Sequence, residues 1–276
     1  MKLFGPKDIK IHLGKILQSQ KNTLTGKKII DLPAGSGVSS SQLYEMGADV
    51  EPYDLFPDFF KDKRLTCKFA DLAEILPIKD NYADFVLCQE GVEHIADQMN
   101  LFKEFNRILK KKGTLLVTTP NDSKLRSKLS ILLAESEYAG KVMPPNEIDS
   151  IWFSERDNEN LYYGHLFLVG IQKLRNLAKL NGFTIKKIHH IRANHTSVLL
   201  LILFYPFILL TNWRAYFRNK KKHPERKELY YELTKLNTNA KILVDGHLCV
   251  EFTKELEAKD VSKELKGKFT DYNITT

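Results

Sequence analysis

Three aspartates stand where predicted strands end in the first third of the chain. Asp31 precedes the loop Pro-Ala-Gly-Ser-Gly, and Asp54 and Asp71 end the next two strands. A carboxylate just ahead of a glycine loop would repel a pyrophosphate, but it would suit a ligand that carries an ammonium and a sulfonium group. The loop lacks the third glycine of the dinucleotide fingerprint, because Ser40 occupies that position, so its remaining G-x-G is weak evidence. The aspartates therefore predict a cationic ligand, of which S-adenosylmethionine is an example.

A second group of reactive side chains follows the fourth predicted strand. Glu90, Glu93 and His94 lie close together in the sequence, and His165 stands just before a predicted helix. If the predicted sulfonium ligand donates its methyl group, the transfer is an in-line displacement with a neutral leaving group, and the protein mainly aligns the acceptor and removes its proton. Two carboxylates and an imidazole one helical turn apart could also offer a divalent cation part of a ligand shell. Purely structural roles, such as capping a helix or orienting a loop, remain open for these residues.

Alternating strands and helices must position these groups. Apolar runs and turn signals predict strands at 27–32, 48–53, 65–69, 82–88, 114–119, 183–191 and 247–252. Helices are predicted after the glycine loop, over 97–111 and over 166–180. Right-handed crossovers between parallel strands place helices on both faces, so the fold class is α/β, doubly wound. Ligands of such sheets bind beyond the carboxyl ends of the strands, where the side chains named above should meet.

Two segments interrupt this alternation within a predicted single domain over residues 1–276. Residues 121–163 contain prolines, acids, amides and scattered aromatics, which predicts a lid or substrate loop. Residues 197–240 form a hydrophobic and basic insert, predicted to be helical, before the last strand.

The run from Asp31 to Gly37 resembles the D-x-x-x-G-x-G signature of class I S-adenosylmethionine-dependent methyltransferases. The resemblance covers residues 25–121 and 164–191, and it implies a Rossmann-like seven-stranded sheet, mostly parallel with an antiparallel last strand. In that family the residue matching Asp54 holds the ribose hydroxyls, and the residue matching Asp71 faces the adenine amino group. Pro33 departs from the pattern, because the family usually has glycine there and proline has no N–H to offer a ligand. The cofactor-binding residues implied are Asp31, Pro33, Ala34, Gly35, Gly37, Asp54, Leu55, Asp71, Leu72 and Gln89.

The E-x-x-E-H run, followed later by a histidine, is similar to two branches of this family. These are the quinone-pathway O-methyltransferases and the 2′-O-methyltransferases of small-RNA ends. The resemblance implies a divalent metal such as Mg²⁺ that holds a substrate hydroxyl. Its implied ligands are Glu90, Glu93, His94 and His165, of which Glu90, His94 and His165 are also the candidate catalytic residues.

Charge and cysteine content limit the setting of this chemistry. Lys and Arg (42) exceed Asp and Glu (34) by 8, a balance that suits nucleic acid, anionic lipid or an acidic substrate. The three cysteines include no CxxC pair, which argues against a disulfide framework and a thiolate zinc site. Residues 1–15 lack a signal-peptide core, so a cytoplasmic protein is expected.

The insert contains a 13-residue apolar run, 198–210, that includes Pro206. We expect Pro206 to break this run, which is then too short to cross a bilayer. The aromatic and basic residues that follow it suit the headgroup layer of an anionic membrane. We therefore predict a peripheral contact of 198–222 with the cytoplasmic membrane face; a core or dimer-interface helix and a re-entrant span are the alternatives.

The predicted function is methylation of oxygen on an amphiphilic small molecule, a quinone precursor or a lipid-linked glycan. The motifs of exocyclic-amine and cytosine-C5 DNA methyltransferases are absent, because Cys-Gln-Glu-Gly follows strand four and no cysteine follows a proline. An RNA 2′-O-methyltransferase is the alternative enzyme, although no RNA-binding module is recognisable and nucleic acid is not the expected partner. A non-catalytic cofactor-binding scaffold is the alternative from another class. The sequence does not predict the oligomeric state.

Overall fold

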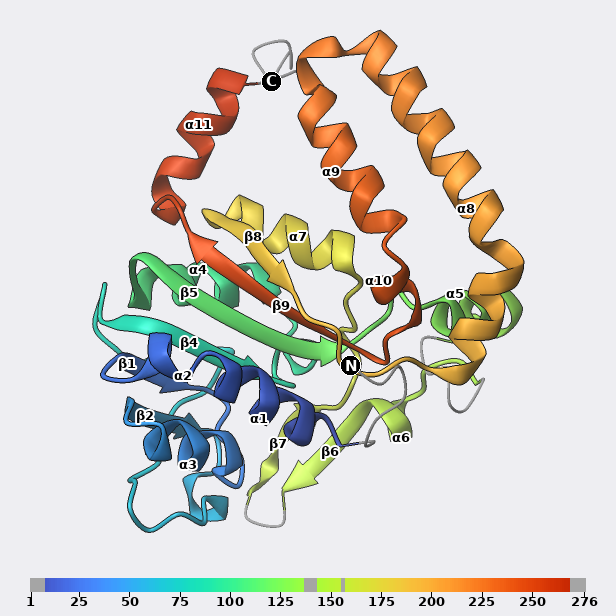
Figure 1. Ribbon diagram of the computed structural model, residues 1–276. Coiled ribbons are helices and arrows are strands. Elements are labelled where there is room, and N and C mark those ends of the chain that lie inside the picture. Colours follow the sequence, from blue (N-terminus) through green and yellow to red (C-terminus); the bar gives the residue numbers. More distant parts are fainter. Residues whose placement is uncertain (1–7, 137–142, 155–156, 269–276) are drawn as a thin grey trace. The chain divides into compact units, whose positions relative to one another are not determined.

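A seven-stranded sheet carries the predicted site residues (Figure 1). The strand order is β3-β2-β1-β4-β5-β9-β8 in the computed structural model, which describes residues 8–136, 143–154 and 157–268. The strands are β1 Lys28–Asp31, β2 Asp49–Asp54, β3 Lys68–Phe69, β4 Ala83–Gln89, β5 Leu109–Pro120, β8 Phe183–Ile188 and β9 His247–Lys254. The pairs among β1 to β5 are parallel, and β8 pairs with β9 in the antiparallel direction. The predicted Rossmann-like fold is confirmed.

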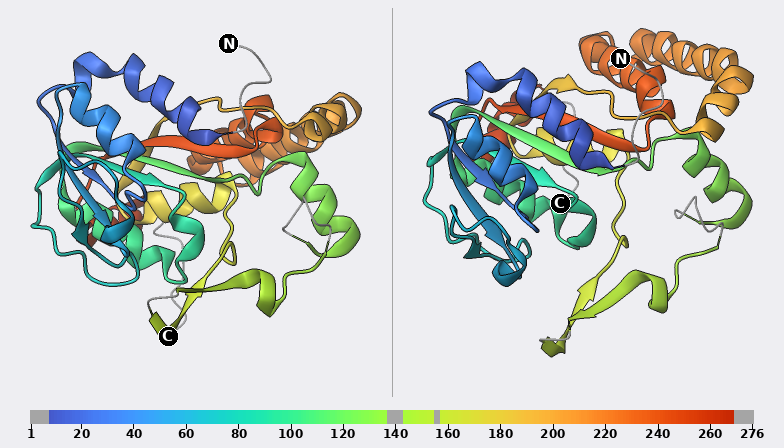
Figure 2. Two further views of the ribbon diagram at one scale, coloured as in Figure 1. Left: turned by 90° about the horizontal axis from the view of Figure 1, so that it is seen from below. Right: turned by 60° about the horizontal axis from the view of Figure 1, so that its bottom comes forward.

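Helices cover both faces of this sheet (Figure 2). Helices α1 (Ile9–Ser19) and α3 (Val38–Glu45) lie on one face, and α4 (Gln98–Ile108) and α7 (Ile171–Leu180) lie on the other. Phe102 of α4 is fully buried and stacks edge to face on Phe183 and Phe252, with ring centroids 6.4 and 6.3 Å away. Because such aromatic pairs bury large apolar areas, this cluster fixes α4 against the last two strands.

The contacts divide the chain into two compact units, which are described separately. The sheet unit comprises Leu13–Thr118, Arg175–Ile188 and Val250–Thr276. The helical unit comprises Met1–His12, Thr119–Leu174 and His189–Cys249.

Several predicted boundaries in the sheet unit are wrong. The helix predicted to continue to Lys111 ends at Ile108, and β5 begins at Leu109 rather than Thr114. Ala83 pairs with Leu109 while Phe85 pairs with Thr114, so the residues between Leu109 and Thr114 form a bulge on β5. Ile108 and Leu109 both fit the apolar spacing of the predicted helix, so this spacing predicts a helix that continues past them. Leu109 is in fact the first residue of β5. The third strand is also shorter than predicted. Helix α7, whose first residues belong to the helical unit, begins at Ile171, five residues later than predicted.

The helical unit has more regular structure than predicted for residues 121–163. It contains α5 (Leu125–Ala134), α6 (Glu147–Ser150) and an antiparallel pair of strands, β6 (Ile151–Ser154) and β7 (Asp157–Tyr163). Residues 137–142 and 155–156 of the predicted lid lie outside the described residues. The predicted lid therefore includes a helix and a hairpin, while its function stays a prediction.

The insert before β9 is a pair of long helices with a short third one. These are α8 (His195–Lys222), α9 (Lys227–Asn237) and α10 (Ala240–Val244). Helices α8 and α9 lie side by side (Figure 1), joined by hydrogen bonds from Tyr205 Oη to Thr238 O (3.0 Å) and from Asn237 Nδ2 to Asn212 Oδ1 (3.0 Å). The helical insert is thus confirmed.

The predicted break at Pro206 is wrong. Helix α8 continues through this proline for 28 residues, even though Pro206 has no N–H to donate to the carbonyl of Ile202. By length and composition alone α8 is therefore long and apolar enough to cross a membrane, and only 6% of its most apolar window is buried. One such helix does not by itself establish a span.

Candidate cofactor site

The loop between β1 and α3 owes its shape to two glycines. Gly35 and Gly37 have positive φ angles of 54° and 87°, which non-glycine residues rarely adopt. A Cβ on Gly37 would lie 2.7 Å from the ring of Phe60, so this ring packs directly on the loop. Apart from Gly35 itself and its two chain neighbours, no described residue has an atom within 4 Å of a Cβ built on Gly35. The loop is therefore closed at Gly37 and open at Gly35, where a ligand could approach the backbone.

Asp31 is a buried carboxylate at the end of β1, with only 1% of its surface exposed. Ser40 Oγ donates a hydrogen bond to its Oδ2 at 2.5 Å, while its Oδ1 has no hydrogen-bond partner among the described residues. Desolvation by burial raises the pKa of Asp31 to about 7, the Ser40 hydrogen bond opposes this shift, and the charge of Asp54 adds to it. An ammonium group near Oδ1 of Asp31 would donate a hydrogen bond to this oxygen and would also balance the negative charge of the carboxylate.

Asp54 ties the second strand to the glycine loop. Its Oδ2 accepts a hydrogen bond from the Gly35 N–H at 2.7 Å, and its Oδ1 accepts one from the Phe56 N–H at 2.8 Å. The Ala34 N–H donates to Tyr53 O at 2.8 Å, which adds a second link between the same segments. Each carboxylate oxygen of Asp54 has another lone pair, so the group can still accept hydrogen bonds from a ribose. Leu55, the next residue, is half-buried.

The loops after β3 and β4 meet the loop after β1 at Gly91. A Cβ on Gly91 would lie 2.7 Å from Pro33 Cδ and 3.1 Å from Leu72 Cδ1. Asp71, beside Leu72, accepts a hydrogen bond from the Ala73 N–H at 2.8 Å, which closes a tight turn. Pro33, which departs from the family pattern, therefore lies close to Gly91 and to the buried Leu72. This contact brings together predicted site residues from three loops.

Replacing Gly91 with alanine should disturb this contact. Because Pro33 and Cys88 Sγ (3.2 Å) also crowd the added methyl group, we expect a loss of about 1–3 kcal/mol in the free energy of unfolding and weaker S-adenosylmethionine binding. Urea denaturation and titration calorimetry measure the two effects. Gly246→Ala, outside any helix, is the control, since its Cβ would make only an ordinary contact with Arg192 O at 3.8 Å. Wild-type stability and affinity in Gly91→Ala would show that the three loops do not depend on this contact.

The carboxyl end of β4 carries Gln89 and Glu90. Gln89 Oε1 accepts a hydrogen bond from Ser39 Oγ of α3 at 2.8 Å. Glu90 has a φ of 51°, a left-handed conformation that is uncommon outside glycine. Its N–H donates to Thr118 O at 3.0 Å and its carboxylate accepts from Thr118 Oγ1 at 2.9 Å. The neighbouring strand β5 therefore holds this conformation, and such held backbone strain is typical of functional sites.

The remaining catalytic and metal candidates fall in both units. Glu93 and His94 belong to the short helix η2 (Val92–His94) of the sheet unit, where Glu93 is fully buried and His94 is half-buried. His165 is an exposed residue of the helical unit. Glu90, Glu93 and His94 thus share one loop, and the participation of His165 with them stays a prediction.

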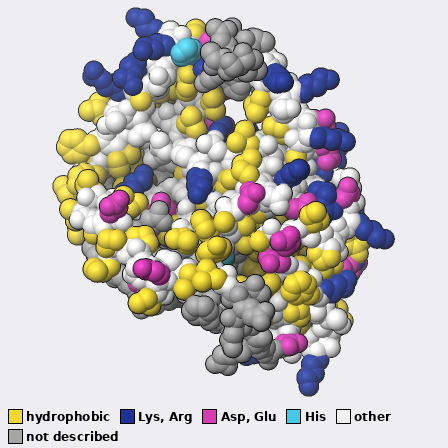
Figure 3. Space-filling view, turned by 180° about the vertical axis from the view of Figure 1, so that it is seen from behind, with side chains coloured by type: hydrophobic (Ala, Val, Ile, Leu, Met, Phe, Trp, Pro, Cys, Tyr) yellow, Lys and Arg dark blue, Asp and Glu magenta, His cyan; other side chains and the backbone are white. Residues whose placement is uncertain are grey.

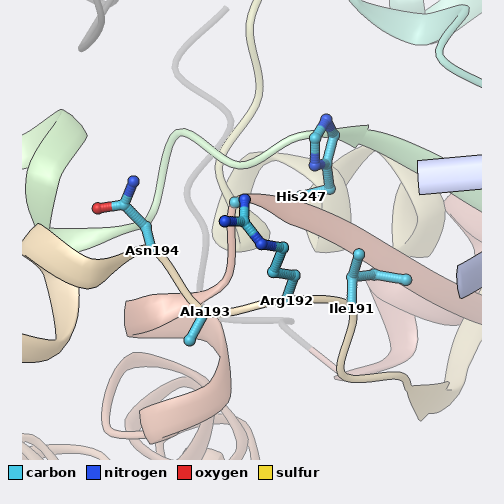
Figure 4. A pocket seen from close by; sticks show the side chains of 6 residues that line it. Ile191, Arg192, Ala193, Asn194 and His247 are labelled. Carbon is cyan, nitrogen blue, oxygen red and sulfur yellow. The ribbon is translucent and has the colours of Figure 1, made fainter. Parts of the chain in front are cut away.

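A cavity in the helical unit involves other residues (Figure 4). Its lining comprises Ile191, Arg192, Ala193, Asn194, Gly246 and His247, and no predicted site residue is among them. Sequence reasoning also missed Phe60 and Gly91 as parts of the cofactor site. It identified Ser40 only as the residue at the missing third glycine, whereas its hydroxyl contacts Asp31.

Comparisons with known proteins agree with this geometry. A family model described as Methyltransferase domain matches residues 12–188, which is more than half of the chain. A ubiquinone biosynthesis O-methyltransferase from Actinobacillus pleuropneumoniae is 26% identical over 141 residues, 46% of this chain and 59% of that protein. The mitochondrial protein of that name from Bos taurus is 29% identical over 150 residues, 46% of this chain and 40% of that protein. The chain thus spans about half the length of the curated relatives it matches.

A solved structure with the same fold covers nearly the whole chain. The SAM-dependent methyltransferase from Archaeoglobus fulgidus aligns with a TM-score of 0.52 and 14% identity over 89% of this chain and 94% of that one. At this identity the likeness concerns the fold, which agrees with the sheet order described above. With the family model matching most of its length, the chain belongs to the methyltransferase domain family.

Proposed function

We propose that the protein methylates a hydroxyl oxygen of an amphiphilic small molecule, foremost a quinone precursor and otherwise a lipid-linked glycan, at a membrane surface. The observation that carries this proposal is the similarity to ubiquinone biosynthesis O-methyltransferases. The exposed apolar length of α8 supports an amphiphilic acceptor and a peripheral position on the cytoplasmic membrane face.

The cofactor residues have distinct proposed tasks. The residues around the glycine loop fit S-adenosylmethionine, which supplies the methyl group when bound. Asp31 would pair with its ammonium, Asp54 would accept its ribose hydroxyls, and Asp71 with Leu72 would border its adenine. Gln89 and Glu90 close the loop at the end of β4. Glu90, His94 or His165 would take the proton from the acceptor hydroxyl, because a neutral hydroxyl is a poor nucleophile.

An acceptor screen tests the reaction. The protein, supplied with S-adenosylmethionine labelled in its methyl group, is offered a hydroxylated quinone precursor, a lipid extract and an RNA extract in parallel. We expect label on oxygen of the quinone precursor, with RNA unlabelled. Label in RNA would instead support the 2′-O-methyltransferase alternative, and absence of label in all three would support the non-catalytic scaffold. Asp31→Asn, which should bind S-adenosylmethionine more weakly, serves as the low-activity control.

A divalent cation at Glu90, Glu93, His94 and His165 remains part of the proposal. The described carboxylates suit a hard cation such as Mg²⁺, and the cation would lower the pKa of a bound hydroxyl. A chelator should lower turnover by about tenfold or more, Mg²⁺ should restore it, and Glu90→Gln should have a similar effect. Turnover that is indifferent to both treatments would remove the metal and leave base catalysis by His94 or His165.

A further inference from the structure

Two helices of the helical unit expose large apolar side chains to solvent. On α5, Leu132 is 79% exposed and Leu133 is 71% exposed, and Ile131 beside them is also exposed. On α8 the exposed large apolar side chains are Leu199, Ile202, Leu203, Phe204, Phe207, Leu210 and Phe217. Contiguous exposed apolar surface of this kind marks an interaction site in a soluble protein.

The two helices are neighbours that pack through small residues. The Arg126 N–H of α5 donates to Ser197 Oγ of α8 at 3.2 Å, and Ser127, Ser130 and Ser197 are buried. Serines therefore occupy much of the buried side, together with Leu125 and Tyr216, while most of the large apolar side chains of α5 and α8 are exposed. Figure 3 shows hydrophobic side chains gathered along the left edge, over these helices, with Lys and Arg above them.

The charge of these helices identifies the partner. Within their bounds α5 and α8 contain seven Lys and Arg residues and no Asp or Glu. Along α8 the exposed stripe runs at intervals of three or four residues from Leu203, Phe207 and Leu210 to Arg214 and Arg218. The apolar part of this stripe suits the acyl boundary of a lipid surface, and its arginines suit the anionic headgroups. Trp213 lies between the two parts, as aromatic residues at a membrane interface do.

The charge of these helices disfavours a dimer through this surface, and the contacts of α8 with α9 disfavour a transmembrane α8. A symmetric dimer through this surface would place seven cations against seven cations. A transmembrane α8 would draw α9 into the acyl core, because Asn237 of α9 bonds to Asn212 and Tyr231 of α9 stacks on Trp213 with ring centroids 6.2 Å apart. Helix α9 carries charged residues, including Lys227 and Glu228, whose burial in lipid is costly.

We infer that α5 and α8 form one lipid-binding surface that lies in the headgroup layer of an anionic bilayer, with α8 along the membrane rather than across it. This inference rests on the membrane position in the proposed function and deepens it, because it adds α5 to the predicted contact of residues 198–222.

Vesicle flotation tests the surface, with vesicles of phosphatidylcholine alone and of phosphatidylcholine mixed with phosphatidylglycerol. The wild-type chain should float with the mixed vesicles. Leu132→Ser with Leu133→Ser on α5, and separately Ile202→Ser with Phe207→Ser on α8, should each lower this binding by about tenfold. Replacing Lys220, Lys221 and Lys222 with glutamine should lower it at least tenfold and remove the preference for phosphatidylglycerol. Ile75→Ser, equally exposed but in the sheet unit, should bind as wild type does.

Three results would overturn the inference. The first is wild-type chain that does not float, and the second is an α5 variant that floats as well as wild type. The third is a concentration-dependent dimer that the same variants abolish, which would assign the surface to a second copy. Circular dichroism checks that the variants fold. Quinone-precursor methylation in lipid-free buffer separates the two proposals. If the wild-type chain floats but does not methylate, only the proposed acceptor is contradicted. If it methylates but does not float, only the proposed lipid-binding surface is contradicted.

Discussion

Asp31→Asn should weaken S-adenosylmethionine binding by about a hundredfold and at the same time stabilise the cofactor-free protein. The loss of affinity follows because a buried ion pair between a carboxylate and an ammonium becomes a weaker hydrogen bond from that ammonium to a neutral amide. Among the described residues Oδ1 of Asp31 has no other partner, so nothing in the site replaces the lost interaction. Titration calorimetry with S-adenosylmethionine measures the change.

The gain in stability has a definite sign. The pKa of Asp31 is raised to about 7 in the folded chain, mainly by burial, from 3.8 for an ordinary aspartate. The folded chain therefore binds this proton more tightly than the unfolded chain does, so the contribution of Asp31 to stability falls as the pH rises from about 4 to about 7. Above that range the ionised carboxylate lowers the free energy of unfolding by an amount on the order of 2–4 kcal/mol. Asparagine has no charge to bury, so urea denaturation at about pH 8 should show a higher free energy of unfolding for the variant.

A matched variant separates this effect from a general loss of charge. Asp49→Asn removes a carboxylate at the exposed start of β2, where it pairs with Lys28. This control should bind the cofactor normally and should not be stabilised. Equal cofactor affinity in Asp31→Asn and wild type would remove the assignment of Asp31. A variant that loses stability would show that the carboxylate supports the fold instead.

Local sequence signals were sufficient for the parts of the site that lie along one segment. Asp31, Gly35 and Gly37 belong to one strand and its turn, so their types and spacing alone predicted a glycine loop beside a carboxylate. The backbone agrees, since both glycines have positive φ angles. Asp54 could be predicted because an acid at the end of a strand lies at the carboxyl edge of a parallel sheet.

Contacts between distant segments could not be predicted from such signals. Phe60 packs on Gly37 from beyond β2, and Gly91 brings Pro33 and Leu72 together from three loops. No periodicity links these positions, because each loop follows a different strand. Likewise Pro206 predicted a break in the insert, yet packing of α8 against α9 and α10 keeps the helix continuous. Tertiary contacts of this kind outweigh the local preference of one residue.

The affinity for S-adenosylmethionine should fall roughly fiftyfold between about pH 7.5 and about pH 5, because Asp31 must be ionised to pair with an ammonium. Burial raises the pKa of Asp31 to about 7, so most of the free protein carries a proton at this position at the lower pH. Binding must then release that proton, and each further unit of pH costs about tenfold in affinity.

Calorimetry in buffers of different ionisation enthalpy detects the released proton directly. In wild type the apparent binding enthalpy should vary with the buffer near pH 6, and in Asp31→Asn it should not. Asp31→Asn should also show a flat affinity over the same range, with circular dichroism confirming that both proteins stay folded. A wild-type affinity that is independent of pH would mean that the carboxylate is already ionised, or that the ammonium is held elsewhere. The dependence of affinity on pH therefore decides whether Asp31 binds the ammonium. If Asp31 pairs with the ammonium, binding releases its proton; if Asp31 is only a buried acid of the fold, binding leaves the proton in place.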